Sequence, residues 1–373
     1  MWKTGTLGEI CKMYQPKTLS AKQMKAEGAY DVYGANGVIG KYDQYNHEAP
    51  QILVTCRGST CGSVNLSKPY SWINGNAMVI QPETSMVSMR YMEYLCRGGI
   101  NWSKAITGAA QPQITRNSIE PILLSYPSLA EQDRIVAQLD ASFAKIDRAI
   151  AIIEAKQGEI ETLQATSLRT ALSGHGDWKT VKLGKVCNIH NGGTPKSKVD
   201  EYWGGDVQWL TPKDMGQLQS QFVSETERQI TQKGLEESAA NLVTVNSIIL
   251  SCRAPIGYIA VNQVPMSFNQ GCKGLVPSKD ILLEYLYYFL FASKQLLNDL
   301  GTGTTFKEIS KKTLSQVELR LPPMAEQQRT VTKLDAVFAA TQTALDSILK
   351  AKDNYQALKS TLMAQALQTS EDA

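Results

Sequence analysis

Two stretches of this sequence, one in each half, combine an arginine with amide side chains. Cys56-Arg57-Gly58-Ser59-Thr60 resembles Cys252-Arg253-Ala254-Pro255-Ile256-Gly257, and Asn74-Gly75-Asn76 lies 195 residues before Asn269-Gln270-Gly271. An arginine can donate two hydrogen bonds to guanine, and an asparagine or glutamine can form two with adenine, while lysines and backbone N–H groups near glycine hold phosphates. The pattern therefore predicts a nucleic-acid recognition surface in each half.

The candidates for DNA binding are polar, cationic or aromatic residues in and around these stretches. In the first half they are Asn36, Lys41, Arg57, Ser59, Lys68, Asn74, Asn76, Gln111 and Gln113. In the second half they are Thr194, Lys196, Lys198, Trp203, Lys213, Arg253, Asn269, Gln270, Lys273, Thr304 and Lys307. Each candidate also has a structural interpretation, because an arginine can pair with an internal carboxylate and a tryptophan can belong to the core.

Motifs for catalysis and metal binding are incomplete. The segment Gly34–Lys41 resembles a phosphate-binding loop, but Ala35 stands where glycine is needed and Tyr42 where serine or threonine is needed. Leu321-Pro322-Pro323-Met324 lacks the amide and the aromatic ring of the amino-methyltransferase motif that it partly resembles. The seven cysteines are never spaced C-x-x-C and the three histidines lie far apart, which argues against a disulfide framework and a zinc site. We expect no metal site, and keep an enzyme with unrecognised catalytic residues as an alternative.

Composition indicates a soluble, cytoplasmic protein. Of the 373 residues, 43% are hydrophobic and 20% are charged, and no apolar run approaches the roughly 18 residues that a membrane helix needs. Residues 1–127 and 178–324 carry net charges of +4 and +3, whereas 128–177 and 325–373 carry −3 and −1. This alternation suits two polyanion-binding modules joined by acidic connectors.

An internal repeat divides the chain into two copies. Trp2-Lys3-Thr4 recurs as Trp178-Lys179-Thr180, and Ala130–Leu172 aligns with Ala325–Leu367 without a gap, with 16 of 43 positions identical. An alignment that tolerates no insertion over this length indicates a rigid element, and apolar residues spaced by three and four indicate a long helix.

One apolar stripe runs along each predicted helix. The residues expected to pair the helices are Leu139, Phe143, Ile146, Ile150, Ile153 and Ile160 in the first copy, and Leu334, Phe338, Leu345, Ile348 and Tyr355 in the second. A single stripe buries itself most simply against another stripe, so we expect the two helices to form a coiled coil. The alternative is two independent amphipathic helices, each packed on its own globular block.

The blocks before the helices predict a mixed α/β (α+β) fold. Short β-branched or apolar runs, such as 51–55 and 247–251, are bounded by Gly, Pro and Asn, and each block has one expected helix, at 89–96 and 282–297. The expected divisions are 1–127 as the first globular domain, 128–173 as the central helix, 174–177 as a hinge, 178–322 as the second globular domain, 323–369 as the C-terminal helix and 370–373 as a tail.

Several of these motifs resemble a known family, the specificity (S) subunits of type I restriction-modification systems. They are Gly192-Gly193-Thr194-Pro195-Lys196, the run 202–215 (YWGGDVQWLTPKDM), Phe268-Asn269-Gln270-Gly271, Gly301-Thr302-Gly303-Thr304-Thr305 and the Pro-Pro-x-x-Glu-Gln sequence that begins the second helix. The first half departs from them and carries the run 33–40 (YGANGVIG), which is similar to another variant of the domain.

The resemblance implies two target-recognition domains on a pair of antiparallel helices, each domain reading half of a bipartite target in the major groove of double-stranded DNA. The helices would set the spacer between the half-sites and dock two modification (methyltransferase) subunits, which flip and methylate an adenine in each half. Two restriction (motor-nuclease) subunits can join for cleavage. S-adenosylmethionine, ATP and Mg are then expected on the partner subunits, with no cofactor and no catalysis in this chain. The alternative function is a scaffold whose helices recruit proteins while the blocks bind protein or sugar.

Overall fold

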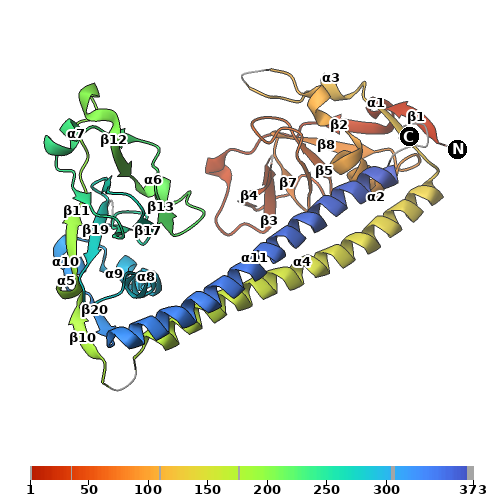
Figure 1. Cartoon of the computed structure of the whole chain (residues 1–373). Coiled ribbons are helices and arrows are strands. Elements are labelled where there is room, and N and C mark those ends of the chain that lie inside the picture. Colours follow the sequence, from red (N-terminus) through yellow and green to blue (C-terminus); the bar gives the residue numbers. More distant parts are fainter. Residues whose placement is uncertain (1, 35, 109–110, 175–176, 304–306, 368–373) are drawn as a thin grey trace. The chain divides into compact units, whose positions relative to one another are not determined.

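The computed structural model describes residues 2–34, 36–108, 111–174, 177–303 and 307–367 (Figure 1). The chain forms two compact units, one of Met1–Glu154 with Ile348–Ala373 and the other of Ala155–Ser347. Each unit contains one globular block and one stretch of both long helices. The predicted mixed α/β class is confirmed.

The first globular block is built from three small sheets. Its strands are β1 (Lys3–Thr6), β2 (Cys11–Tyr14), β3 (Tyr30–Gly34), β4 (Gly37–Tyr42), β5 (Ile52–Thr55), β6 (Val64–Leu66), β7 (Trp72–Ile73), β8 (Ala77–Pro82) and β9 (Leu123–Tyr126). They pair in the orders β2-β8-β5-β6, β4-β3-β7 and β1-β9. The α-helices are α1 (Leu7–Ile10), α2 (Met89–Tyr94) and α3 (Arg116–Ile119).

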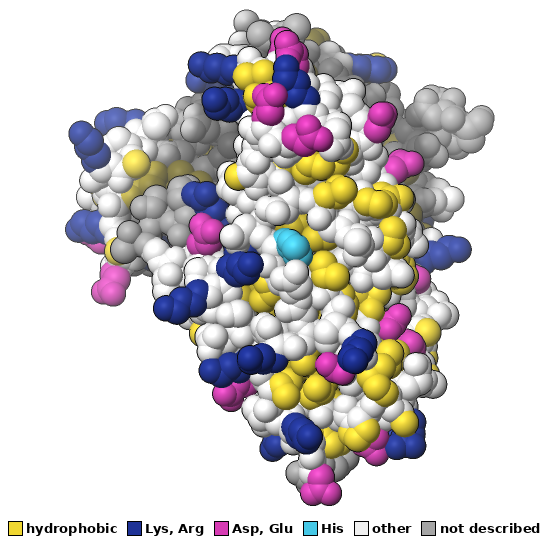
Figure 2. All heavy atoms as spheres, turned by 60° about the vertical axis from the view of Figure 1, so that its left-hand side comes forward, with side chains coloured by type: hydrophobic (Ala, Val, Ile, Leu, Met, Phe, Trp, Pro, Cys, Tyr) yellow, Lys and Arg dark blue, Asp and Glu magenta, His cyan; other side chains and the backbone are white. Residues whose placement is uncertain are grey.

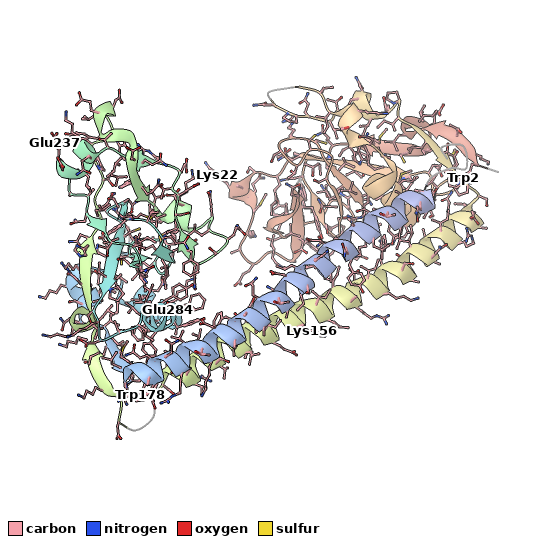
Figure 3. The ribbon with its side chains drawn as sticks, viewed as in Figure 1. Trp2, Lys22, Lys156, Trp178, Glu237 and Glu284 are labelled. Carbon is pink, nitrogen blue, oxygen red and sulfur yellow. The ribbon has the colours of Figure 1, made fainter. Side chains whose placement is uncertain are left out.

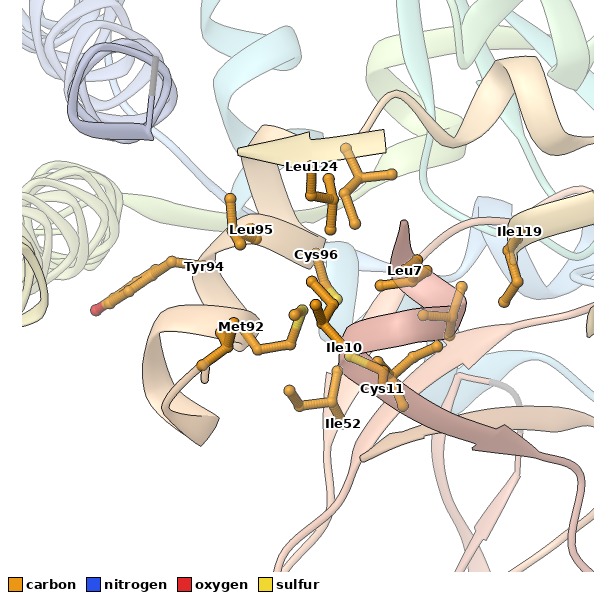
Figure 4. Packing of buried hydrophobic residues seen from close by; sticks show 14 of the residues in the cluster. Leu7, Ile10, Cys11, Ile52, Met92, Tyr94, Leu95, Cys96, Ile119 and Leu124 are labelled. Atoms are coloured by element: carbon orange, nitrogen blue, oxygen red, sulfur yellow. The ribbon is translucent and has the colours of Figure 1, made fainter. Parts of the chain in front are cut away.

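Both faces of strand β5 are buried, which explains its run of apolar residues. Ile52 and Val54 point into the main core with α1 and α2, whereas Leu53 packs with Tyr33 and Val79 in a second cluster. Side chains that alternate between two buried clusters are apolar on both faces, as Ile52, Leu53 and Val54 are. The main core is seen in Figure 4, where the helix that carries Met92 lies against Ile10 and Ile52.

The second globular block repeats this plan with additions. Its strands are β10 (Lys179–Lys182), β11 (Cys187–Asn191), β12 (Trp203–Leu210), β13 (Phe222–Val223), β14 (Gln229–Ile230), β15 (Leu242–Val243), β16 (Ile248–Ser251), β17 (Ile259–Asn262), β18 (Met266–Phe268), β19 (Cys272–Pro277) and β20 (Glu318–Leu321). They pair in the orders β11-β19-β16-β17-β13, β14-β12-β18-β15 and β10-β20. The α-helices are α5 (Leu183–Val186), α6 (Pro212–Met215), α7 (Gln232–Glu236), α8 (Leu283–Ala292), α9 (Lys294–Leu300) and α10 (Lys311–Ser315).

The helices expected inside the blocks differ from the prediction at their C-terminal ends. The expected helix 89–96 ends as α2 at Tyr94 and continues as a wide turn over Leu95–Gly99, where two glycines weaken the helix. The expected helix 282–297 is two helices that break at Ser293, whose hydroxyl hydrogen-bonds back to the Phe289 carbonyl at 2.7 Å.

Two long helices, α4 (Leu129–Leu172) and α11 (Met324–Leu367), follow the blocks. In the first unit, Lys352 Nζ lies 2.8 Å from Glu154 Oε1, and Lys359 pairs with Asp147. As the residue number rises in one helix it falls in the other, so the helices run antiparallel there. In the second unit, Gln164 Nε2 donates to Thr341 Oγ1 at 2.7 Å in the same sense. The predicted antiparallel helix pair is thus present in both units.

The predicted helix-pairing residues are all at least partly buried. Leu139, Ile146 and Leu334 are buried, and Phe143, Ile150, Ile153, Ile160, Phe338, Leu345, Ile348 and Tyr355 are partly buried.

The apolar stripes also pack the helices against the globular blocks. Pairing of the helices with each other and packing on the blocks, which the sequence analysis gave as alternatives, therefore occur together. Leu139 belongs to the core of the first block together with Leu367 of the other helix. In the second unit, Leu334 packs with Tyr288 of the block and with Leu168 of the other helix. Of the helices in the described part of the chain, none is long and apolar enough to cross a membrane.

Candidate nucleic-acid interface

In the first unit, loops that are far apart in the sequence converge on Arg57. The Cys56 N–H donates to the Asn76 carbonyl at 3.2 Å, and the Ile114 N–H donates to the Cys56 carbonyl at 2.9 Å. Arg57 and Gln113 form an isolated antiparallel bridge. These backbone bonds bring the loops after β5, after β7 and after residue 106 to one place on the block.

Asn36 joins the β3–β4 turn to this group of loops. Its Nδ2 donates to Thr60 Oγ1 at 2.6 Å, and its Oδ1 accepts from Thr55 Oγ1 at 3.1 Å. Of the candidates, six lie exposed in these converging segments: Asn36, Arg57, Ser59, Asn76, Gln111 and Gln113.

Three candidates of the first unit lie outside this group. Lys41 and Lys68 both face Asp31, with N···O distances of 3.8 and 3.1 Å, at the end of β3 that is remote from the Asn36 turn. Asn74 is 3% exposed, and its amide hydrogen-bonds the backbone N–H and carbonyl of Leu19. An amide that is buried and already paired cannot reach a base edge, so Asn74 has a structural role here and we leave it out of the proposed interface.

The second unit repeats the convergence around Arg253. The Cys252 N–H donates to the Gly271 carbonyl at 2.7 Å, the Ile309 N–H donates to the Cys252 carbonyl at 2.8 Å, and Arg253 bridges to Glu308. These two hydrogen bonds and the bridge correspond one by one to those around Arg57. The side chains of the loops did not by themselves require this correspondence.

Candidates from the Gly192-Gly193-Thr194 segment also reach this group. Thr194 Oγ1 donates to Gln270 Oε1, and Asn269 Oδ1 accepts from the Gly271 N–H at 3.0 Å. A Cβ atom at Gly192 would lie 1.9 Å from the Asn269 carbonyl oxygen, so only glycine permits this approach.

The cationic candidates of the second unit differ in exposure. Lys273 is buried with its Nζ 3.8 Å from Glu308, and exposed Lys213 lies 2.7 Å from Glu227, which raises the pKa of that lysine. Burial and pairing argue that Lys273, in β19, fixes the segment that carries Glu308, and we leave it out of the proposed interface as well. Lys196, Lys198 and Lys307 are exposed, and Thr304 lies outside the described residues.

Sequence reasoning singled out Trp203 but missed its partner. The Arg228 guanidinium carbon lies 3.6 Å from the centroid of the Trp203 ring, and Trp203 meets Trp209 edge to face at 5.1 Å. Trp203 and Arg228 are 25 positions apart, so this contact is not evident from the sequence. In the sequence, only the tryptophans indicated that a cation could stack there.

Known proteins that resemble the chain decide its family. A family model described as type I restriction modification DNA specificity domain matches residues 1–162 and 175–351. The chain belongs to this specificity family. A type I restriction enzyme MjaIX specificity subunit from Methanocaldococcus jannaschii is 39% identical over 42% of this chain, and the Escherichia coli EcoR124I/EcoR124II specificity subunit is 30% identical over 59% of it. The matches span 37% and 55% of those two proteins' own lengths.

Solved structures share the fold of this specificity-family chain. A chain from a solved type I restriction-modification complex superposes with a TM-score of 0.77 at 22% identity, covering 98% of this chain and 97% of that one. The HsdS subunit from Thermoanaerobacter tengcongensis has a TM-score of 0.51 at 20% identity, covering 98% and 96%.

The surface of this specificity-family chain carries charges of both signs. Figure 2 shows a face on which Lys and Arg side chains have Asp and Glu side chains among them. The face drawn in Figure 2 is therefore not uniformly basic. Over the described residues, no group of three or more His, Cys, Asp or Glu side chains could hold a metal ion.

Proposed function

We propose that this chain is the DNA-recognition subunit of a type I restriction-modification complex. The observation that carries the proposal is the repeated convergence of loops on Arg57 and Arg253, each with at least one exposed amide side chain nearby. Two such groups in one chain suit a bipartite target, with each group reading one half-site.

We assign residues 1–127 and 178–322 as the recognition domains, 128–173 and 323–369 as the helices that set the spacer, 174–177 as the hinge and 370–373 as the tail. The exposed candidates of the converging loops would contact DNA. Lys41, Lys68, Lys196, Lys198, Lys213 and Lys307 would serve as phosphate contacts, because a flexible ammonium group gives charge without base discrimination.

The partners follow from the same proposal. Two modification subunits would dock on the helices in the prokaryotic cytoplasm, and two restriction subunits can join. S-adenosylmethionine, ATP and Mg would be bound by those partners, while this chain binds no cofactor and transfers no methyl group. The purified chain should therefore show no methyltransferase, ATPase or nuclease activity, and methyl transfer by the chain alone would contradict this assignment.

Exchange of one domain tests the proposal. Residues 1–127 are replaced by the matching block of a family member, the chain is expressed with its methyltransferase partner, and methylated sites are sequenced. We expect one half of the methylated motif to change and the other half to stay the same. A change in both halves, or methylation independent of this chain, would refute the modular assignment.

Binding to DNA can be measured separately by a gel shift at several salt concentrations. A DNA-recognition subunit should lose affinity as salt rises, because phosphate contacts release counterions. A scaffold that binds only proteins should give no shift at any salt concentration, with or without the methyltransferase partner.

A further inference from the structure

An irregular pairing in strand β12 places the ring of Trp203. Trp203 and Val207 both pair with Ile230 of β14, so the residues between them form a bulge. Gly204 has a φ of +78°, and a Cβ atom at Gly205 would lie 2.5 Å from Thr231 Cα. Both positions need glycine, and a bulge of this kind re-aims the side chains beside it.

The bulge puts Trp203 beneath the guanidinium group of Arg228. The guanidinium carbon lies 3.6 Å from the Trp203 ring centroid and 5.6 Å from that of Trp209. The Trp203 Nε1 donates to the Lys196 carbonyl at 3.3 Å, and the Trp209 N–H donates to the Arg228 carbonyl at 3.3 Å, which fixes both partners of the stack. Stacking uses the face of a guanidinium group and leaves the N–H groups in its plane available.

Arg228 has no carboxylate partner among the described residues, in contrast to three lysines of its block. Lys213, Lys233 and Lys273 each pair with a glutamate, whereas exposed Arg228 forms no ion pair with any residue that the structure describes. A planar donor group is thus stacked on a ring, and its N–H groups donate to no residue that the structure describes.

The stack adjoins the converging loops. The Trp209 Nε1 donates to the Gly193 carbonyl at 3.0 Å, and the next residue, Thr194, donates to Gln270. A ligand seated on the Gln270 loop therefore lies beside the part of the block that carries Arg228.

We propose that Arg228 reads a guanine in the half-site of the second domain, and that Trp203 is its positioning residue. Two N–H groups of Arg228 would donate to O6 and N7 of the base in the major groove. The inference rests on the proposed DNA-recognition function. A base reader needs the plane that the stack supplies, because two parallel hydrogen bonds require a fixed orientation, whereas a phosphate contact requires only the charge.

The test uses the complex of this chain with its methyltransferase partner and a set of variants. Arg228→Lys keeps the charge but loses the planar pair of donors, and Arg228→Ala loses both. Lys233→Ala is the matched control, since it removes another exposed cation of the same block, one that is paired with Glu201. Affinity is measured for duplexes in which each base pair of the second half-site is varied, and each guanine is also replaced by 7-deazaguanine, which lacks the N7 acceptor.

We expect both Arg228 variants to lose discrimination at one guanine, by roughly 5- to 150-fold, with the other positions and the first half-site unchanged. At that guanine, 7-deazaguanine should weaken the wild-type complex and leave the Arg228→Ala complex unaffected. Trp203→Leu should reduce discrimination at the same position only, which a general structural role would not do.

Three results would overturn the inference: a uniform loss over all sequences, rescue of full affinity by Arg228→Lys, or an unchanged motif in Arg228→Ala. These differ from failure of the proposed function itself, in which the wild-type complex shows no bipartite preference. Lys233→Ala should leave the preference intact, and a loss there equal to that of Arg228→Ala would show that net charge alone matters.

Discussion

Gln132 and Gln327 make the same three hydrogen bonds in the two units. Gln132 Oε1 accepts from the Ser88 N–H, and its Nε2 donates to the Met86 and Pro127 carbonyls, at 2.8 to 2.9 Å. Gln327 Oε1 accepts from the Leu282 N–H at 2.8 Å, and its Nε2 donates to two carbonyls at 3.0 Å.

Both glutamine side chains are fully buried. Each therefore ties the start of a long helix to the N-cap residue of a helix in its block, Ser88 before α2 or Leu282 before α8. Figure 3 shows Trp2 and Trp178 each near the beginning of the long helix that follows its block. The Trp178 Nε1 donates to Glu326 Oε2 at 3.1 Å.

Replacing Gln327 by alanine should destabilise the protein by about 2–4 kcal/mol, because it leaves the Leu282 N–H and the Asp280 and Pro322 carbonyls without their partner. Urea unfolding followed by tryptophan fluorescence measures the change. The control is Gln328→Ala, which alters the neighbouring exposed side chain and should change the unfolding free energy by less than about 0.5 kcal/mol. Equal effects of the two variants would show that the hydrogen bonds of Gln327 contribute little.

The pair of Lys352 and Glu154 provides a test of the antiparallel register. Glu154→Lys places two cations side by side and should lower stability by up to about 1 kcal/mol at low salt, since both side chains are partly exposed. The double variant Glu154→Lys with Lys352→Glu should recover most of the loss, and high salt should shrink both effects. If the double variant is no better than the single one, the two side chains do not meet in solution.

The buried thiols should not react with thiol reagents in the native protein. Burial raises the pKa of Cys11, Cys187 and Cys252 to about 12 and that of Cys56 to about 11, so these groups stay protonated at pH 8. We expect a thiol reagent at pH 8 to label partly exposed Cys61 first and the others only after denaturant is added. Rapid labelling of several thiols without denaturant would contradict the packing of both cores.

The same groups give a pH dependence. Above about pH 8.5 the unfolded chain loses thiol protons that the folded chain keeps, so the free energy of unfolding should fall as pH rises from there. Substituting Cys187 by alanine should weaken this slope, which denaturant titrations at pH 7 and at higher pH can measure.

Lengthening both long helices together should change the spacer of the DNA target if the proposed function holds. Four residues inserted after Ile150 and four after Tyr355 keep the Asp147–Lys359 and Glu154–Lys352 pairs on either side in register. The insertion lengthens each helix by about 6 Å and rotates it by about 40°. The added length is close to two base-pair steps of about 3.4 Å. Sequencing of methylated sites should then show unchanged half-sites with a spacer one or two base pairs longer.

Insertion into α4 alone is the control for that experiment. It shifts one helix against the other and should lower stability, because apolar residues of the stripe then face polar ones. An unchanged spacer with full methylation in the doubly extended chain would mean that the helices do not set the distance.

The sequence alone predicted the long helices well. Their apolar stripe has a local period, and the gap-free repeat from Ala130 to Leu172 required a rigid element, so no long-range information was needed. The offset between the two copies of the internal repeat likewise matched the Arg57 loop with the Arg253 loop. It also marked Gln132 and Gln327 as identical positions, but gave them no role.

The tertiary structure decided which candidates are available to a ligand. Asn74 and Asn76 are two residues apart in the same loop, yet one is buried against Leu19 and the other is exposed. Arg228 meets Trp203 only because a bulge re-aims the tryptophan across a strand pair. Composition and spacing cannot specify such contacts, since strand register and loop closure join residues that are distant in the chain, and burial then determines which polar groups are already paired.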